Sequence, residues 1–335
     1  MLINLNKNTQ KINFTGLDGV AKKAVGKLHI SPEELTALRQ NYAEKEILFK
    51  QGGIGDCYLI SVLKSTMFGL NEYANKTGQQ GLNAKNWLKK LVVKDDKGNA
   101  EVFPPILKKL KVRLPVTKMN VTFFPGSQGN GRITFLECGY GILRKWTDEL
   151  VKDKKWMSEL LNAGRPHLAM LDITGLKGGE ISVAKADFKN EKELKIAEKF
   201  FKEHTGKLFK KFQKHPENLI LIASTKADVP AFLHPGHGYS VKKVVDSGLL
   251  LVDPLNKTNE KIFINNDDFY KYFESVNFAR LRPEKMFKMI EETKKAVKDS
   301  PVLNLSVKPS FEPIRDSSKC YAKKDHIFVK DSYID

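Results

Sequence analysis

A cysteine near the start of the chain has surroundings that are typical of a reactive thiol. Cys57 follows a stretch with three glycines in residues 52–55 and precedes an uncharged, mostly apolar run over residues 58–63. This pattern predicts a tight loop that leads into a buried helix, with Cys57 in its first turn. The positive end of a helix favours the thiolate, the nucleophilic form of cysteine. A buried structural cysteine is the commoner alternative, but burial does not require a glycine loop.

Two polar residues beside Cys57 are expected to support its chemistry. Asp56 directly precedes the expected helix, where an aspartate is a good N-cap residue. Gln51 lies on the other side of the glycine loop, and its side-chain amide can return towards the cysteine. Together with the backbone N–H of Cys57, that amide would form an oxyanion hole, which stabilises the negative charge that develops on a carbonyl oxygen during acyl transfer.

A histidine far along the chain is the candidate base. His237 lies between Gly236 and Gly238 and leads into a strand-like run over residues 239–245. Flanking glycines leave the imidazole accessible to a neighbouring side chain, and an imidazole that takes the thiol proton activates a catalytic cysteine. A lone histidine is more often a surface or a satisfied core residue. His234 is a local competitor, which we rank lower because it precedes a proline and lies before the strand.

The candidate third residue is Asp253, which follows the apolar run over residues 249–252. A carboxylate there can accept the imidazole N–H of His237 and fix its tautomer, although aspartate before proline is also a common turn initiator. If residues 246–248 form the hairpin turn, a regular ladder sets Asp253 roughly four residues, or ~13 Å, from the position opposite His237. We therefore expect a bulge in the first strand or a bend at Asp253, with Asn256 as the reserve partner of the histidine.

The elements that must position these residues change in character along the chain. Apolar residues at helical spacing predict helices after Cys57 and over residues 83–93, 136–150, 189–214 and 284–297. Short apolar runs between polar or glycine-containing turns predict strands over residues 181–184, 219–223, 239–245, 249–252 and 261–264.

These patterns predict an α+β fold with four regions. A helix-rich lobe over residues 45–165 carries Cys57, and an antiparallel-sheet lobe over residues 166–285 carries His237 and Asp253. Residues 1–44 are expected to form an N-terminal extension. Residues 286–335 are expected to form a C-terminal helix and a flexible tail.

The net charge of +18 raises the question of an anionic partner. Lysines are interleaved with acidic residues, as over residues 189–214, which favours a solvated helix face over a nucleic-acid surface. An acidic partner for this basic surface is the alternative. The longest uncharged apolar runs are much shorter than the ~20 residues that span a bilayer, so no membrane span is expected.

The three cysteines Cys57, Cys138 and Cys320 are too few and too scattered for a disulfide framework. Residues 1–15 lack the continuous apolar segment of a secretory signal. We therefore expect a reducing, cytoplasmic location, in which a thiol can stay free for chemistry.

The motifs resemble those of the calpain family of papain-like cysteine peptidases. Residues 51–59 are similar to the nucleophile motif of the family, and residues 236–241 are similar to its Gly-His-Ala-Tyr-Ser-Val string, with Gly238 in place of alanine. Weaker similarities follow the family's order at residues 112–115, 135–143, 168–175 and 219–224. The resemblance covers roughly residues 45–285, without the regulatory C-terminal domains of animal calpains.

The resemblance implies a papain-like two-lobe fold and a polypeptide substrate. By this resemblance, Cys57 attacks the scissile carbonyl, His237 shuttles the proton and Gln51 stabilises the oxyanion. The family has Asn-Pro-Trp where this chain has Asp253, a proline and Leu255, so the tryptophan that shields the histidine's hydrogen bond is missing. Calcium control is implied only by the resemblance. The sequence itself contains no EF-hand loop, predicts no metal ligands and requires no cofactor.

Two other functions agree with the same residues. A transglutaminase-like acyl transferase would use the same cysteine, histidine and aspartate but transfer the acyl group to an amine. A degenerate peptidase would act as a basic binding module, although intact Cys57 and His237 favour catalysis.

Overall fold

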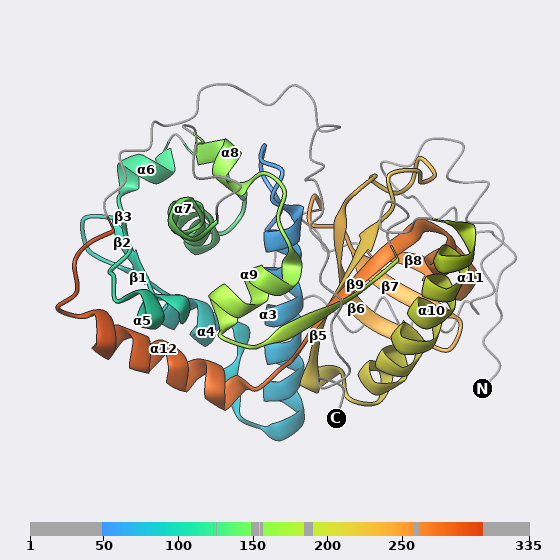
Figure 1. Ribbon diagram of the computed structural model, residues 1–335. Coiled ribbons are helices and arrows are strands. Elements are labelled where there is room, and N and C mark those ends of the chain that lie inside the picture. Colours follow the sequence, from blue (N-terminus) through green and yellow to red (C-terminus); the bar gives the residue numbers. More distant parts are fainter. Residues whose placement is uncertain are drawn as a thin grey trace, which may run out of the picture.

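A long helix, α3 (Cys57–Thr77), separates a group of helices from a six-stranded sheet in the computed structural model (Figure 1). Helices and antiparallel strands lie in separate regions, so the chain is of the α+β class. The expected extension over residues 1–44 and the tail after residue 303 lie outside the described residues. The structure describes residues 49–122, 124, 126–148, 154, 157–183, 190–256 and 261–303.

The helix α3 is buried over most of its length because other elements pack against it on two sides. Its first seven residues carry no charged side chain, and Leu59, Ile60 and Leu63 are fully buried. The helix stops at Gly78, whose φ of 73° lies in the left-handed region that glycine adopts without strain. The helix predicted after Cys57 is therefore confirmed.

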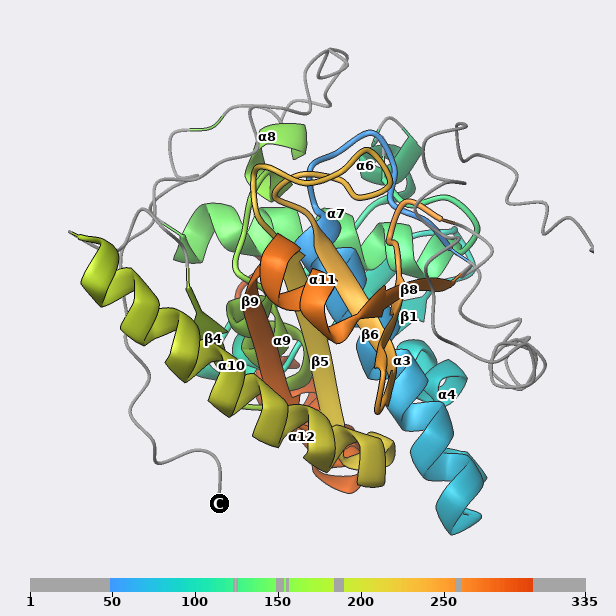
Figure 2. The same cartoon turned by 90° about the vertical axis from the view of Figure 1, so that its right-hand side faces the viewer.

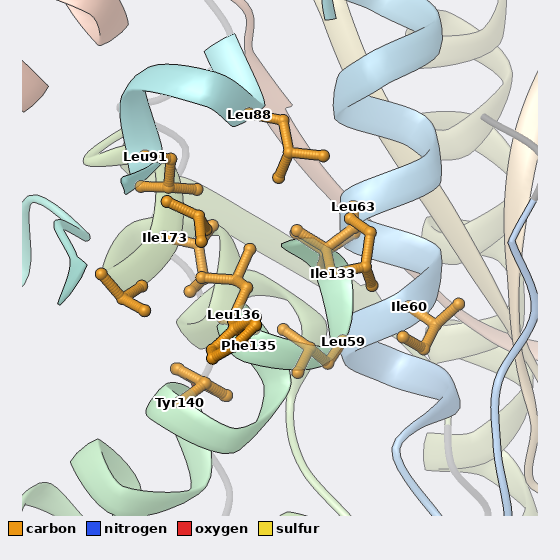
Figure 3. Packing of buried hydrophobic residues seen from close by; sticks show 14 of the residues in the cluster. Leu59, Ile60, Leu63, Leu88, Leu91, Ile133, Phe135, Leu136, Tyr140 and Ile173 are labelled. Carbon is orange, nitrogen blue, oxygen red and sulfur yellow. The ribbon is translucent and has the colours of Figure 1, made fainter. Parts of the chain in front are cut away.

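The largest cluster of buried apolar side chains joins α3 to the helices on one of its sides. Figure 3 shows Leu59 and Leu63 of α3 beside Ile133 and Leu136 of α7. Burying one such side chain contributes about 1.5–3 kcal/mol. The helices of this group are α4 (Ala84–Leu91), α5 (Ile106–Leu110), α6 (Lys118–Thr122), α7 (Gly131–Thr147), α8 (Met157–Leu161), α9 (Pro166–Thr174) and α12 (Pro283–Val297).

Three short antiparallel strands accompany these helices. The helix-rich region that the sequence predicts therefore also contains a small sheet. The strands run in the order β1-β2-β3, and β2 is the central one. Their bounds are β1 (Val92–Lys94), β2 (Ala100–Val102) and β3 (Pro115–Val116).

The six-stranded sheet lies on the other side of α3, and all its neighbouring strands are antiparallel. The helices α10 (Glu191–Lys214) and α11 (Asn266–Tyr272) cover the face opposite α3 (Figure 2). The strand order is β4-β9-β5-β6-β7-β8. The bounds are β4 (Gly178–Ser182), β5 (Leu219–Thr225), β6 (Gly238–Val245), β7 (Gly248–Val252), β8 (Lys261–Asn265) and β9 (Phe273–Arg280).

The strand β5 explains why this sheet shows continuous apolar runs in the sequence. Ile220 and Ile222 belong to the cluster that contains α3, whereas Leu221 and Ala223 belong to the cluster beneath α10. A strand that is covered on both faces needs no polar alternation. The five strands predicted from the apolar runs are confirmed, with ends that differ by at most three residues.

The strand β9 is the one element of this sheet that the sequence patterns do not predict. It lies between β4 and β5, and it follows α11 directly. Glu274 and Asn277 interrupt its apolar residues, and no glycine or proline marks its start. A continuous apolar run and a turn residue at its start, the two signals used for the other strands, are therefore absent here.

The helix α10 has the amphipathic pattern predicted over residues 189–214. Phe201, Leu208 and Phe212 pack beneath it on the sheet, and its lysines lie on the exposed side. This arrangement agrees with a solvated helix face. Across the described ranges, no helix combines the length and the apolar character that a membrane crossing requires.

The hairpin between β6 and β7 is one residue tighter than expected. Val245 pairs with Gly248, so the turn contains only residues 246 and 247. Gly248 belongs to the strand, where a Cβ atom would lie 2.1 Å from the carbonyl oxygen of Ile264 on β8. Only glycine allows this close approach of two backbones.

Of the two alternatives that the sequence leaves open, a bulge in the first strand or a bend at Asp253, the structure contains the bulge. The register shifts at Lys242, and beyond it Ser240 pairs with Val252. Asp253 is therefore only two residues, or ~7 Å, from the position opposite His237. A side chain on each strand can cover that distance.

Candidate active site

Cys57 is the first residue of α3, and it is partly exposed. The carbonyl oxygen of Asp56 accepts hydrogen bonds from the N–H groups of Leu59 at 2.9 Å and Ile60 at 3.1 Å, which closes the first turn. The thiol thus sits at the positive end of a 21-residue helix, as the sequence predicts.

Two hydrogen bonds attach the start of α3 to the strand that follows His237. The hydroxyl of Ser61 donates to the carbonyl oxygen of Gly238 at 2.6 Å. The hydroxyl of Ser240 donates in return to the carbonyl oxygen of Ser61 at 2.9 Å. These bonds hold the histidine and the cysteine on neighbouring elements although 180 positions separate them in the chain.

The thiol of Cys57 and the imidazole of His237 form a hydrogen bond, and the charge of each group shifts the pKa of the other. Burial alone would raise the pKa of the thiol, but the charge of His237, its hydrogen bond and a backbone hydrogen bond from Gly238 bring that pKa below its ordinary value. Burial would likewise lower the pKa of His237, but the charge of Cys57 and the bond to Asp253 raise it to about 10. These interactions therefore favour the thiolate of Cys57 together with the imidazolium of His237.

Asp253 holds the other side of the imidazole. Its Oδ1 atom lies 3.0 Å from Nε2 of His237 and accepts the backbone N–H of Leu255 at 2.8 Å. Because Nε2 faces the carboxylate, Nδ1 is the nitrogen that faces the thiol. The backbone N–H of His237 donates to the hydroxyl of Thr225 at 2.9 Å, which fixes the backbone at the entry to β6. Cysteine, histidine and aspartate are thus brought together in the predicted order.

No family model and no curated protein matches the chain. The assignment of a function therefore depends on the geometry of this site. The side chains of His237 and Asp253 are 9% and 12% exposed, so little water competes for their hydrogen bond.

Gln51 is buried in the glycine loop, where its amide N–H₂ donates to the carbonyl oxygen of Ile54. One of its two N–H bonds is used in this way, and the Oε1 atom has no hydrogen-bond partner among the described residues. The backbone N–H of Gln51 donates to the carbonyl oxygen of Pro254 at 2.8 Å, so the loop is attached to the turn after Asp253. Its expected role in an oxyanion hole stays a prediction.

The expected capping role of Asp56 is wrong. It occupies the N-cap position, but its side chain makes no capping hydrogen bond. The carboxyl group is fully buried near Glu137 of α7, and no hydrogen-bond donor among the described residues reaches either of its oxygens. Glu137 accepts the Ser127 N–H with both oxygens, at 2.9 and 3.1 Å. Burial raises the pKa of Asp56 to about 7, and burial together with the charge of Asp56 raises the pKa of Glu137 well above its ordinary value.

The lower-ranked His234 also contacts Asp253. Its Nε2 lies 3.4 Å from Oδ2 of the carboxylate, and its ring meets the ring of His237 edge-on at 5.2 Å between centroids. Burial would raise the pKa of Asp253, but the hydrogen bonds from His234 and His237 and the charge of His237 hold it well below its ordinary value. Asp253 therefore stays ionised and has a histidine on each oxygen.

The reserve residue Asn256 lies in the turn that follows Asp253. Its backbone N–H donates to the Asp253 carbonyl oxygen at 3.0 Å, and its own carbonyl oxygen accepts from Lys64 at 3.1 Å. The histidine's hydrogen bond goes to Asp253 instead. Sequence patterns did not identify Lys64, although it is the only charged residue between Asp56 and Glu72.

Possible metal ligands do not gather in the parts of the chain that the structure describes. No group of three or more histidine, cysteine, aspartate or glutamate side chains there could hold a metal ion. Cys138 is buried as a free thiol, and burial raises its pKa to about 12, so it is an apolar packing residue.

Proposed function

We propose that the protein is a cysteine endopeptidase with the papain-like two-lobe arrangement and a calpain-like active site. The observation that supports this best is the imidazole of His237, which is hydrogen-bonded to the Cys57 thiol on one side and to Asp253 on the other. A nucleophile, a base and a group that orients the base are the requirements for covalent acyl transfer.

The first half of the reaction forms a thioester. The Cys57 thiolate attacks the scissile carbonyl carbon, and the carbonyl oxygen takes up the negative charge. The Cys57 N–H at the helix start and the amide of Gln51 stabilise that charge. When the C=O bond re-forms, the C–N bond breaks, and the leaving amine takes the proton from Nδ1 of His237.

The second half releases the acyl group. The now neutral His237 takes a proton from a water molecule, whose oxygen attacks the thioester carbonyl. The C–S bond breaks, a carboxylic acid leaves, and the thiolate–imidazolium pair is restored. Asp253 keeps the imidazole in the same tautomer and orientation in both halves.

The substrate of the proposed enzyme is a polypeptide, and the chemistry needs a reduced thiol. A reducing compartment such as the cytoplasm agrees with the two free cysteines of the described residues, Cys57 and Cys138. Calcium enters the proposal only through the resemblance to calpains.

Isotope incorporation tests hydrolysis directly. A purified unfolded polypeptide is incubated with the protein in H₂¹⁸O, with and without calcium, and the products are analysed by mass spectrometry. The proposal predicts new C-termini that carry ¹⁸O with the natural chain and none with Cys57→Ala. The absence of such products under both conditions would contradict it.

The same experiment with an added labelled amine separates hydrolysis from acyl transfer. A peptidase yields mainly ¹⁸O-labelled carboxyl groups. If the amine instead becomes attached to glutamine side chains without chain cleavage, the transglutaminase-like alternative is correct.

A further inference from the structure

Lys64 is a buried charged residue that the proposed reaction does not use. It lies two turns along α3 from Cys57, and the residue is 0% exposed. A lysine inside a protein is unfavourable unless its ammonium group is compensated, because burial removes it from water. Burial lowers the pKa of Lys64 to about 7, and the charge of Asp253 limits this decrease.

The contacts of Lys64 join three segments that carry the proposed site. Its Nζ donates to the carbonyl oxygen of Asn256 at 3.1 Å, in the turn that follows Asp253. The same Nζ lies 5.1 Å from the ring centre of Phe49, two residues before Gln51. The segment of Gln51 is itself attached to this turn by the bond to Pro254.

We propose that Lys64 is a positioning residue, which holds the turn over residues 253–256 against the start of α3 and so fixes Asp253 for His237. The inference rests on the proposed function, because it assigns a role in the same reaction. Lys64 acts from beneath the turn, on the side of the core, whereas His234 contacts Asp253 from the exposed side.

Stability alone does not explain a lysine at this position. A buried ion can often be replaced by an apolar side chain of similar volume without loss of stability. Methionine would fill the same space between α3 and Phe49 but would leave the carbonyl oxygen of Asn256 without this donor. The positioning role therefore predicts a loss of activity that is separate from any loss of stability.

Another lysine of the same helix provides a control. Lys76 lies in the last turn of α3, about five turns from Cys57, and its Nζ lies 2.7 Å from a carboxylate oxygen of the buried Glu217. Replacing Lys76 removes a lysine and its ion pair from α3 at a distance from the turn of Asp253.

The first test compares Lys64→Met, Lys64→Gln and Lys76→Met. Lys64→Met is expected to lower kcat about 10- to 100-fold with little change in KM, because a small displacement of a catalytic group has effects of this size. Lys64→Gln, which keeps a donor one bond shorter, should retain more activity, and Lys76→Met should keep kcat within about twofold. Equal losses in all three variants, together with lowered melting temperatures, would overturn the proposal.

The second test asks whether Lys64 acts through Asp253. If it does, adding Lys64→Met to Asp253→Ala should change kcat by less than about twofold, because the positioned group is already absent. Losses that multiply would show that Lys64 acts elsewhere and would overturn the inference.

A third measurement does not depend on peptidase activity. At pH 6, Lys64→Met should slow the alkylation of Cys57 by iodoacetamide several-fold, because a loosened Asp253 stabilises the imidazolium and hence the thiolate less well. If the natural chain cleaves no peptide, the proposed function fails, and this alkylation rate alone decides the inference. An unchanged rate in Lys64→Met would then overturn it.

Discussion

The interaction between Cys57 and His237 favours the proton on the imidazole, and this affects the pH at which the site is reactive. The pKa of the thiol is lowered and the pKa of His237 is raised to about 10, so the thiolate–imidazolium form is favoured at lower pH than for an isolated cysteine. The residue types and the glycine pattern allow this pair to be predicted from the sequence. The side of the imidazole that faces each partner required the structure.

Replacing the base should remove the thiolate at neutral pH. In His237→Asn, the pKa of Cys57 should rise towards or above 9, because the burial that remains disfavours the charged form. The rate of alkylation by iodoacetamide, measured from pH 5 to 10, should then increase only at the alkaline end. In the natural chain the increase should come at lower pH. Identical profiles for the two proteins would show that His237 does not activate the thiol.

The choice between the two candidate orienting residues gives a second prediction. Asp253→Ala should lower kcat by roughly 10²–10⁴, because the imidazole loses the acceptor that fixes its tautomer. Asn256→Ala should have little effect, since its hydrogen bonds to Asp253 and Lys64 are made by the backbone. Steady-state kinetics of both variants provide the measurement, and the opposite order of losses would assign the role to Asn256.

One physical reason explains why the sequence does not reveal the roles of Lys64, His234 and Glu137. Each meets its partner across an interface between elements that are distant in the chain. Glu137 did carry a signal, because it is the only acidic residue of α7. Such a residue on an apolar face indicates a buried partner but does not identify it.

At the scale of the elements, the apolar patterns predicted the strands β4 to β8 but not their register. The bulge at Lys242 was expected only because the site needed it, and the tight turn before Gly248 depends on a backbone contact with β8. The strand β9 was missed because its neighbours in the sheet, and not its own composition, make it a strand.

Two buried carboxyl groups, that of Asp56 after the glycine loop and that of Glu137 on α7, predict an unusual pH dependence of stability. The pKa of Asp56 is raised from 3.8 to about 7 in the folded protein. Its stabilising contribution is fully present below the unfolded value and is lost as the pH rises through about 7. In Glu137→Gln, the amide can donate to an ionised Asp56 and the second buried carboxyl group is absent, so this loss should become smaller.

Thermal unfolding between pH 4 and 8 tests this coupling. The melting temperature of the natural chain should fall towards the alkaline end of this range, and that of Glu137→Gln should fall much less. The exposed Asp228→Asn serves as the control and should keep the natural dependence. A Glu137→Gln curve parallel to the natural one would contradict an interaction between the two carboxyl groups.

At the scale of the whole molecule, the last described helix, α12, packs against α4 and α5 and completes the core that contains them. Ile290 of α12 is fully buried in the cluster of α3 and α7, although some 200 residues separate it from α4. The helix over residues 284–297 was predicted from its spacing alone. Its position against the first helices could not be predicted, because no local pattern reports a contact at such separation.

Removing the buried side chain of Ile290 should affect stability more than chemistry. Ile290→Ala should lower the free energy of unfolding by about 2–5 kcal/mol, as expected for a large-to-small change in a core. The exposed Lys288→Ala on the same helix should change it by less than about 0.5 kcal/mol. Urea unfolding measures both values, and equal values would show that α12 is not part of the core.

The central claim is that Cys57 is a peptidase nucleophile, and covalent labelling tests it most directly. The protein is treated with a peptidyl epoxide of the E-64 type, with and without calcium, and the modified residue is located by mass spectrometry. We predict one adduct on Cys57, none on the buried Cys138, and a strongly reduced yield in His237→Asn. Labelling at another residue, or no labelling under either condition, would contradict the account.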